Sequence, residues 1–283
     1  MTNSFVLTLQ CPDRPGLIFA VSGWVANSGG NILDAQQFTE IDANKFFMRT
    51  HFDFPVTRDI EELRSSFTKL AIENEMDFKL VVAEAPMRTL IMVSKQGHCL
   101  NDLLFRQSIG ALNIEVPAIV SNHRELERLA KSYDIDFHHI PVSKDNKEAA
   151  EAHLLELVAD LEIDLVVLAR YMQILSDNVA NQLSGRVINI HHSFLPSFKG
   201  ARPYHQAHDR GVKLIGATAH YVTADLDEGP IIDQGVTRVD HNYAPADLAR
   251  AGQDVESQTL ARAVKLHSES RVLMNGPRTV VFD

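Results

Sequence analysis

Residues 187–192 read Val-Ile-Asn-Ile-His-His, a short apolar run that ends in polar side chains. Such a run is typical of a buried strand, and open α/β sheets bind ligands beyond the carboxyl ends of these strands. Residues 226–230 follow with Leu-Asp-Glu-Gly-Pro. Asn189, His191 and Asp227 thus supply an amide donor, an imidazole and a carboxylate. These groups can polarise a carbonyl, stabilise an oxyanion and move a proton, so the sequence predicts an enzyme.

Apolar strands and helical stretches alternate around this run. This alternation indicates a parallel sheet with helices on both faces. The predicted strands are 90–93, 115–120, 165–169, 187–190, 213–222 and 230–236, and the predicted helices lie near 100–109, 125–133, 147–161 and 246–268.

The first part of the chain has another order, which reads strand, helix, strand, strand, helix, strand. Asp13 is predicted to cap the first helix, with Pro15 in its first turn and Gly29-Gly30 at its end. A small sheet with helices on one face follows from this order. The predicted elements are 5–9, 17–25, 31–40, 45–54, 60–72 and 77–83.

The two patterns meet at a short linker, residues 85–88. A length of 283 residues fits two domains at roughly 100–200 residues each. The sequence therefore predicts the α/β class: a ferredoxin-like βαββαβ domain over 1–84, and a Rossmann-like parallel-sheet domain over 89–283.

Composition restricts the partners and the compartment. The formal net charge of −10 argues against a nucleic-acid surface, which needs clustered Lys and Arg. Two cysteines, Cys11 and Cys99, give no disulfide framework and no zinc spacing. The N-terminus lacks the basic and apolar regions of a signal peptide, and no apolar run reaches the ~18 residues of a membrane span. We expect a soluble cytoplasmic protein that binds neither nucleic acid nor membrane.

The motif Asp13-Arg14-Pro15-Gly16-Leu17 follows the first strand. Alone it is a cap and a tight turn. In its element order, residues 4–84 resemble the ACT family of small ligand-binding domains attached to metabolic enzymes. The resemblance implies a homo-oligomer paired through these domains and an amino-acid effector near the strand–helix loop. The effector residues it implies are Asp13, Arg14 and Gly16, with Asn31 and Ile32 opposite.

The second half resembles the folate-dependent formyltransferase family over about residues 88–283. The resemblance rests on the Asn-Ile-His run, residues 168–176, residues 216–223 and the Leu-Asp-x-Gly-Pro motif. It implies that Asn189, His191 and Asp227 are the catalytic trio. It further implies that the folate substrate contacts Met172, Ile174, Leu175, Asp225 and His220.

A metal site at His191-His192 is not expected, because adjacent residues project in different directions and no carboxylate lies nearby in helical register. No metal or separate cofactor is predicted, since the formylated folate is itself the substrate. His138-His139 is read as structural.

Two departures from the family pattern bear on the reaction. Arg170 stands where a small residue is usual. Transformylases that use ribonucleotides carry a glycine-rich phosphate turn after the first strand, and residues 94–99 here read Ser-Lys-Gln-Gly-His-Cys. With no acceptor pocket evident, water is the simplest acceptor.

We therefore expect hydrolysis of 10-formyltetrahydrofolate to formate and tetrahydrofolate, which would supply formate for purine synthesis and balance one-carbon folate pools. Asn189 and His191 would polarise the formyl group, and Asp227, kept basic by a low dielectric, would activate water. Two alternatives are a formyltransferase acting on a phosphorylated amine, and a non-catalytic amino-acid sensor.

Overall fold

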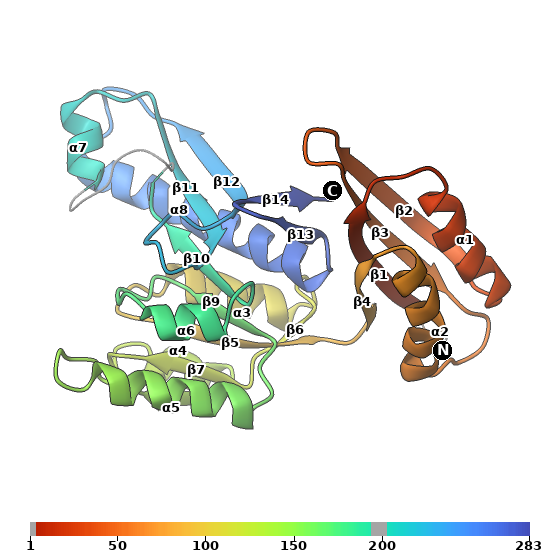
Figure 1. The fold of residues 1–283 in the computed structure, drawn as a ribbon. Helices are drawn as coiled ribbons and strands as arrows, with labels where there is room; N and C mark the ends of the chain where they lie inside the picture. Colours follow the sequence, from red (N-terminus) through yellow and green to blue (C-terminus); the bar gives the residue numbers. More distant parts are fainter. Residues whose placement is uncertain (1–3, 194–202) are drawn as a thin grey trace. The chain divides into compact units, whose positions relative to one another are not determined.

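The N-terminal part of the chain folds as βαββαβ, as predicted (Figure 1). The structure is a computed structural model that describes residues 4–193 and 203–283. The elements are β1 (Ser4–Pro12), α1 (Leu17–Asn27), β2 (Asn31–Glu40), β3 (Lys45–Asp53), α2 (Ile60–Glu73) and β4 (Asp77–Val82). The strands form an antiparallel sheet in the order β2-β3-β1-β4. Both helices cover one face of it and enclose an apolar core.

The start of α1 differs from the prediction that Asp13 caps it. The helix begins at Leu17, and its N-cap is Gly16 with φ 96° and no side-chain hydrogen bond. The backbone N–H of Asp13 donates to the carbonyl of Asn44 at 3.0 Å, so Asp13 still belongs to the end of the β1–β3 pair. Gly16 suits this position because glycine adopts left-handed backbone angles without a Cβ clash.

The larger part of the chain forms a mostly parallel sheet, as predicted. Its elements are β5 (Met87–Val93), α3 (His98–Ser108), β6 (Ile114–Glu115), β7 (Ala118–Ser121), α4 (Glu127–Ser132), β8 (Asp136–His139), α5 (Lys147–Asp160), β9 (Leu165–Leu168), α6 (Asp177–Gln182), β10 (Val187–His191), α7 (Pro203–Asp209), β11 (Leu214–Tyr221), β12 (Ile231–Arg238) and α8 (Pro245–Ser268).

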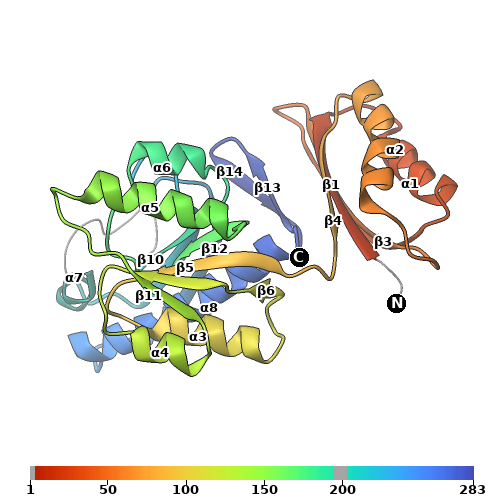
Figure 2. The same cartoon turned by 90° about the horizontal axis from the view of Figure 1, so that it is seen from below.

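The strand order β12-β11-β10-β9-β5-β7-β8 places the first strand of this unit in the middle of the sheet. The chain runs outward from β5 to β8, returns to β9, and then runs outward in the other direction. The point where the order reverses lies between β5 and β9, where such sheets bind ligands. Helices α5 and α6 cover one face, and α3, α4 and α8 cover the other (Figure 2). Strands β11 and β12 are antiparallel.

Several elements were not predicted: the helices α6 and α7, the strands after Ser268 and the division of the strand expected at 115–120. The strand expected at 115–120 is two strands, β6 and β7, because Pro117 between them lacks the N–H that a ladder needs. Helix α6 has six residues, too few for a clear apolar period. Its start is marked by Ser176, whose hydroxyl accepts from the N–H of Val179.

The last residues form a hairpin of β13 (Val272–Asn275) and β14 (Arg278–Val281). Residues 1–85, 269–275 and 280–283 make up one compact unit, and residues 86–268 and 276–279 the other. The predicted second domain kept all residues after 88 together. The first unit holds its C-terminal residues by hydrogen bonds from Gln36 to the Asp283 carbonyl and from Asn275 to Glu40. None of the helices described is long and apolar enough to span a membrane.

Candidate active site

The predicted catalytic residues line one pocket of the second unit. Asn189 and His191 lie at the carboxyl end of β10, and the two-residue period of a strand directs them to the same face. Asp227 comes from the loop between β11 and β12. The predicted folate residues Met172, Ile174, Leu175, Asp225 and His220 line the same pocket.

An imidazole and a carboxylate form the centre of this pocket. Nδ1 of His191 lies 3.2 Å from Oδ2 of Asp227. Nε2 of His191 is buried and has no hydrogen-bond partner among the described residues. Because an unpaired buried polar atom costs free energy, this atom is suited to a group of a bound substrate.

His220 supports Asn189 from the neighbouring strand. Its Nδ1 donates to the carbonyl of Tyr221 at 2.9 Å, and burial lowers the pKa of His220. The neutral ring therefore leaves Nε2 as an acceptor, and the amide nitrogen of Asn189 lies 3.2 Å from it. The register between β11 and β12 shifts between Ala219 and His220, where β12 has one extra residue, Ile232, and irregularities of this kind are common next to active sites.

The expectation that a low dielectric keeps Asp227 basic is wrong. The hydrogen bond from His191 lowers the pKa of Asp227, and this effect outweighs burial, which acts in the opposite direction. The histidines His220 and His192 lower it further. Asp227 is therefore an ionised carboxylate in the pocket.

The loop that carries Asp227 needs a glycine at position 229, two residues after the aspartate. Asp227 has φ 57°, a left-handed angle that is uncommon outside glycine. A Cβ at Gly229 would lie 1.7 Å from the carbonyl oxygen of Tyr221. The N–H of Tyr221 donates to the carbonyl of Pro230, which ties the loop back to β11. The Leu-Asp-x-Gly-Pro motif thus holds the carboxylate by a close backbone approach.

The wall formed by residues 170–175 is apolar and open. Met172 and Ile174 are each 60% exposed, which leaves apolar surface free for a flat ring. The N–H of Met172 donates to the buried hydroxyl of Ser94 at 2.9 Å, and that hydroxyl donates to Asn122. This wall is therefore anchored to the ends of β5 and β7.

A network on α8 was missed by the sequence reading. Glu256 is 1% exposed. Its Oε1 accepts a hydrogen bond from the Tyr204 hydroxyl at 2.8 Å, and its Oε2 lies 2.8 Å from Nε2 of His98. Nε of Arg170 lies 3.4 Å from the same carboxylate. Burial alone would raise the pKa of Glu256, but these partners together lower it. The available signal was an acidic residue on the buried face of an amphipathic helix, between Gly252 and Leu260.

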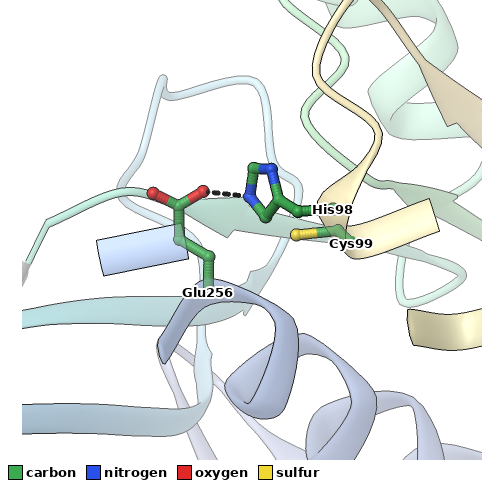
Figure 3. A group of neighbouring side chains, drawn as sticks. All are labelled: His98, Cys99 and Glu256. Atoms are coloured by element: carbon green, nitrogen blue, oxygen red, sulfur yellow. Dashed lines mark hydrogen bonds and ion pairs between the residues drawn. The ribbon is translucent and has the colours of Figure 1, made fainter. Parts of the chain in front are cut away.

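Figure 3 shows His98 and Cys99 facing Glu256, the one cluster among the described residues with the donor set of a metal site. Burial raises the pKa of the Cys99 thiol, so it stays protonated. A cation bound there would also face the guanidinium of Arg170. We therefore interpret the cluster as an ion-pair network.

The predicted effector residues do not form one group within a single chain. Asp13, Arg14 and Gly16 follow the end of β1, where Pro12 pairs with Lys45. Asn31 and Ile32 begin β2, where Asn31 pairs with Asp53. Eight residues of β3, or about 26 Å, separate the two ends. Arg14 donates to the Glu73 carbonyl and the Asn74 amide oxygen. A shared site would need two copies of the chain.

Comparison with known proteins identifies both units. Residues 87–264 match the Formyl transferase family and residues 5–66 match the ACT domain. A formyltetrahydrofolate deformylase from Corynebacterium sp. is 52% identical over 98% of this chain and 97% of its own length. A second one, from Synechocystis sp., is 46% identical over 98% and 97%. The crystal structure of a formyltetrahydrofolate deformylase from Burkholderia mallei aligns with a TM-score of 0.96 and 48% identity, covering 99% of this chain and all of that one.

Proposed function

The chain belongs to the formyltetrahydrofolate deformylase family, and we propose that its pocket hydrolyses 10-formyltetrahydrofolate to formate and tetrahydrofolate through Asn189, His191 and Asp227. The chemistry is hydrolysis of a formamide. The observation that carries the proposal is the pairing of Asp227 with His191 in a pocket that Asn189 shares.

The amide of Asn189 and Nε2 of His191 are suited to the formyl oxygen. Nδ1 of His191 pairs with Asp227, and Nε2, which has no hydrogen-bond partner among the described residues, is left for the formyl oxygen. In the tetrahedral intermediate the formyl oxygen gains negative charge. Preorganised donors at this position stabilise that charge more than they stabilise the substrate carbonyl.

Water is activated by Asp227 in this proposal. One carboxylate oxygen faces His191, and the other, Oδ1, lies 3.8 Å from His220 on the pocket side. As water attacks the formyl carbon, its proton passes to Asp227 and then to the departing folate nitrogen. The lowered pKa makes Asp227 a weak base before the attack begins. It therefore acts by positioning the water molecule and by accepting its proton as the water oxygen bonds to the formyl carbon, which makes that proton more acidic.

The structure around residues 94–99 argues against a phosphorylated acceptor. Lys95 pairs with Glu125 at 3.8 Å, and His98 pairs with Glu256. A Cβ at Gly97 would meet Leu126 at 2.8 Å, so this glycine serves packing. These contacts favour hydrolysis over the transferase alternative. The proposal needs no metal and no separate cofactor.

Formate release without an amine tests the reaction. Purified protein with 10-formyltetrahydrofolate in isotopic water should yield formate that carries one oxygen from water. Added glycinamide ribonucleotide should leave the rate unchanged. A strict need for an amine, with the formyl group recovered on it, would restore the transferase, and no turnover under either condition would favour the non-catalytic sensor.

The proposal extends to the role of the first unit and to the cell. We propose that the ACT domain pairs with a second copy and binds an amino acid near Asp13 and Asn31. The released formate would supply purine synthesis in the cytoplasm and balance the one-carbon folate pools.

A further inference from the structure

Arg170 has an unusual backbone. Its φ is 64°, in the left-handed region that non-glycine residues rarely adopt. Such an angle persists only where the surroundings hold it, and it often marks a functional position. Arg170 lies two residues after the end of β9, next to the point where the strand order reverses.

Both neighbouring strands place Arg170 at the reacting end of the pocket. Leu168 pairs with Asn189 of β10, so Arg170 lies two residues past that pair, as does His191. On the other side, its carbonyl accepts from the N–H of Ser94, one residue after β5. Arg170 lines the pocket together with the catalytic residues.

The side chain of Arg170 is held firmly in place. It is 10% exposed, and its Nε donates to Gln96 at 3.2 Å and lies 3.4 Å from the buried Glu256. His98 and Tyr204 hold Glu256 in turn (Figure 3 shows the His98 contact). Arginine in a satisfied network of this kind is a rigid wall, since its charge is already paired.

Gly252 gives Tyr204 the space to reach this network. A Cβ at Gly252 would lie 1.9 Å from the Tyr204 hydroxyl, which therefore packs across α8 one turn before Glu256. A glycine inside a helix costs about 1 kcal/mol relative to alanine. Three segments of the chain, those with His98, Arg170 and Tyr204, therefore converge on one carboxylate of α8.

We propose that Arg170, clamped by Glu256, is the residue that excludes amine acceptors and leaves room for water alone. This inference rests on the proposed hydrolysis and adds its specificity. A small residue at position 170 would leave a space in the pocket that His191 and Asp227 also line. An amine in that space would compete with water for the formyl carbon, and exclusion by a built-in obstacle is a common source of specificity.

The competing reaction balances without any further reagent. The amine nitrogen bonds to the formyl carbon as the bond from that carbon to the folate nitrogen breaks. The amine loses one proton to Asp227, and that proton passes to the folate nitrogen. The products are a formamide of the amine and tetrahydrofolate.

The test compares the native chain with Arg170→Gly, using glycinamide as the amine and a labelled formyl group. Glycine accepts the positive φ, so this substitution removes the wall and relieves the backbone. The fraction of label recovered in formylglycinamide, corrected for the reaction without protein, should rise at least ~10-fold over the native chain. The matched control is Glu162→Gly, which relaxes another non-glycine residue with positive φ, 49°, at an exposed position.

A second variant keeps the test decisive if Arg170→Gly is inactive. Arg170→Ser shortens the side chain and keeps a non-glycine backbone. If either variant still releases formate and the fraction of label in formylglycinamide is unchanged, the inference is overturned. Loss of formate release in both variants also overturns it. Failure of the native chain to release formate would instead overturn the proposed function. Transfer that rises in the Arg170 variants but not in Glu162→Gly supports the exclusion.

Discussion

At the scale of single residues, the pairing of His191 with Asp227 determines what each can do. The carboxylate holds one ring nitrogen, and the other nitrogen remains for the substrate. Asn189 is oriented by a neutral His220, whose free lone pair faces its amide. One histidine of the site thus faces a carboxylate and the other, kept neutral by burial, faces an amide.

The substitution Asp227→Asn should lower turnover by ~100-fold or more, because it removes both the proton acceptor and the charge that supports His191. Folate affinity should change little, since the apolar wall is untouched. Steady-state kinetics and folate titration measure the two effects. Glu228→Gln, which alters the exposed adjacent carboxylate, is the matched control. Near-normal turnover in Asp227→Asn would remove this residue from the mechanism.

His192 should make the protein less stable in acid. Burial, with Arg170 and His191 nearby, lowers the pKa of His192 to about 4, against 6.5 for an ordinary histidine. Between these values the unfolded chain binds a proton that the folded chain does not, so stability falls as the pH falls. From pH 7 to pH 4, unfolding by urea should show an extra loss of ~1–3 kcal/mol compared with His192→Asn. Equal losses in both proteins would contradict this. The exposed His241→Asn serves as the control.

At the scale of elements, the β11–β12 connection builds the site by irregularity. The register between β11 and β12 shifts at His220, a left-handed residue presents Asp227, and a glycine lets the loop return against Tyr221. None of these features extends the sheet. Irregularities of this kind are common next to active sites.

Gly229→Ala should displace this loop, because the new Cβ would overlap the Tyr221 carbonyl and backbone cannot yield as a flexible side chain can. We expect a stability loss of ~1–3 kcal/mol, typical of overpacking, and a fall in turnover of ~10-fold or more. Thermal unfolding and kinetics measure both. The control Gly23→Ala lies in α1 with open space around it and should stabilise by ~0.5–1 kcal/mol. Unchanged turnover in Gly229→Ala would show that the loop tolerates movement.

At the scale of the whole molecule, the chain joins an ACT domain to a formyl transferase domain. Its C-terminal residues return to the first unit after α8, so that unit is built from both ends of the chain. A truncation that begins at Met87 would leave residues 269–275 and 280–283 without the sheet they pack on. The full chain is therefore the proper object for tests of regulation.

An amino acid that binds the ACT domain should raise the melting temperature of the full chain and change its rate, because ligands stabilise the state they bind. Titration with each common amino acid, followed by light scattering for oligomer size, measures this. Asp13→Ala or Asn31→Ala should reduce the response, and Asp42→Ala in an exposed turn should not. If no amino acid changes the melting temperature or the rate, the domain serves only as an assembly interface.

Most of the architecture was predictable because its signals are local. Nearly every element of both sheets was predicted from three signals. These are apolar residues repeating every two or every 3.6 positions, glycines at helix ends, and continuous apolar runs in buried strands. The motif residues Asn189, His191 and Asp227 were also local, and the fold brings them to one pocket. The short helices α6 and α7, the split at Pro117 and the hairpin of β13 and β14 were missed, because elements of two to seven residues are too short for their periodicity to be detected.

The sequence by itself determined the family and the two folds and indicated the candidate catalytic residues Asn189, His191 and Asp227, because each depends on patterns within a few neighbouring residues. Only the tertiary structure decided the charge state of Asp227, the register shift at His220 and the clamp on Arg170. These depend on partners far apart in the chain, such as His98 and Glu256, 158 residues apart. Such pairs meet only when strand order and helix packing are set, and no local pattern specifies which buried charges will then face one another.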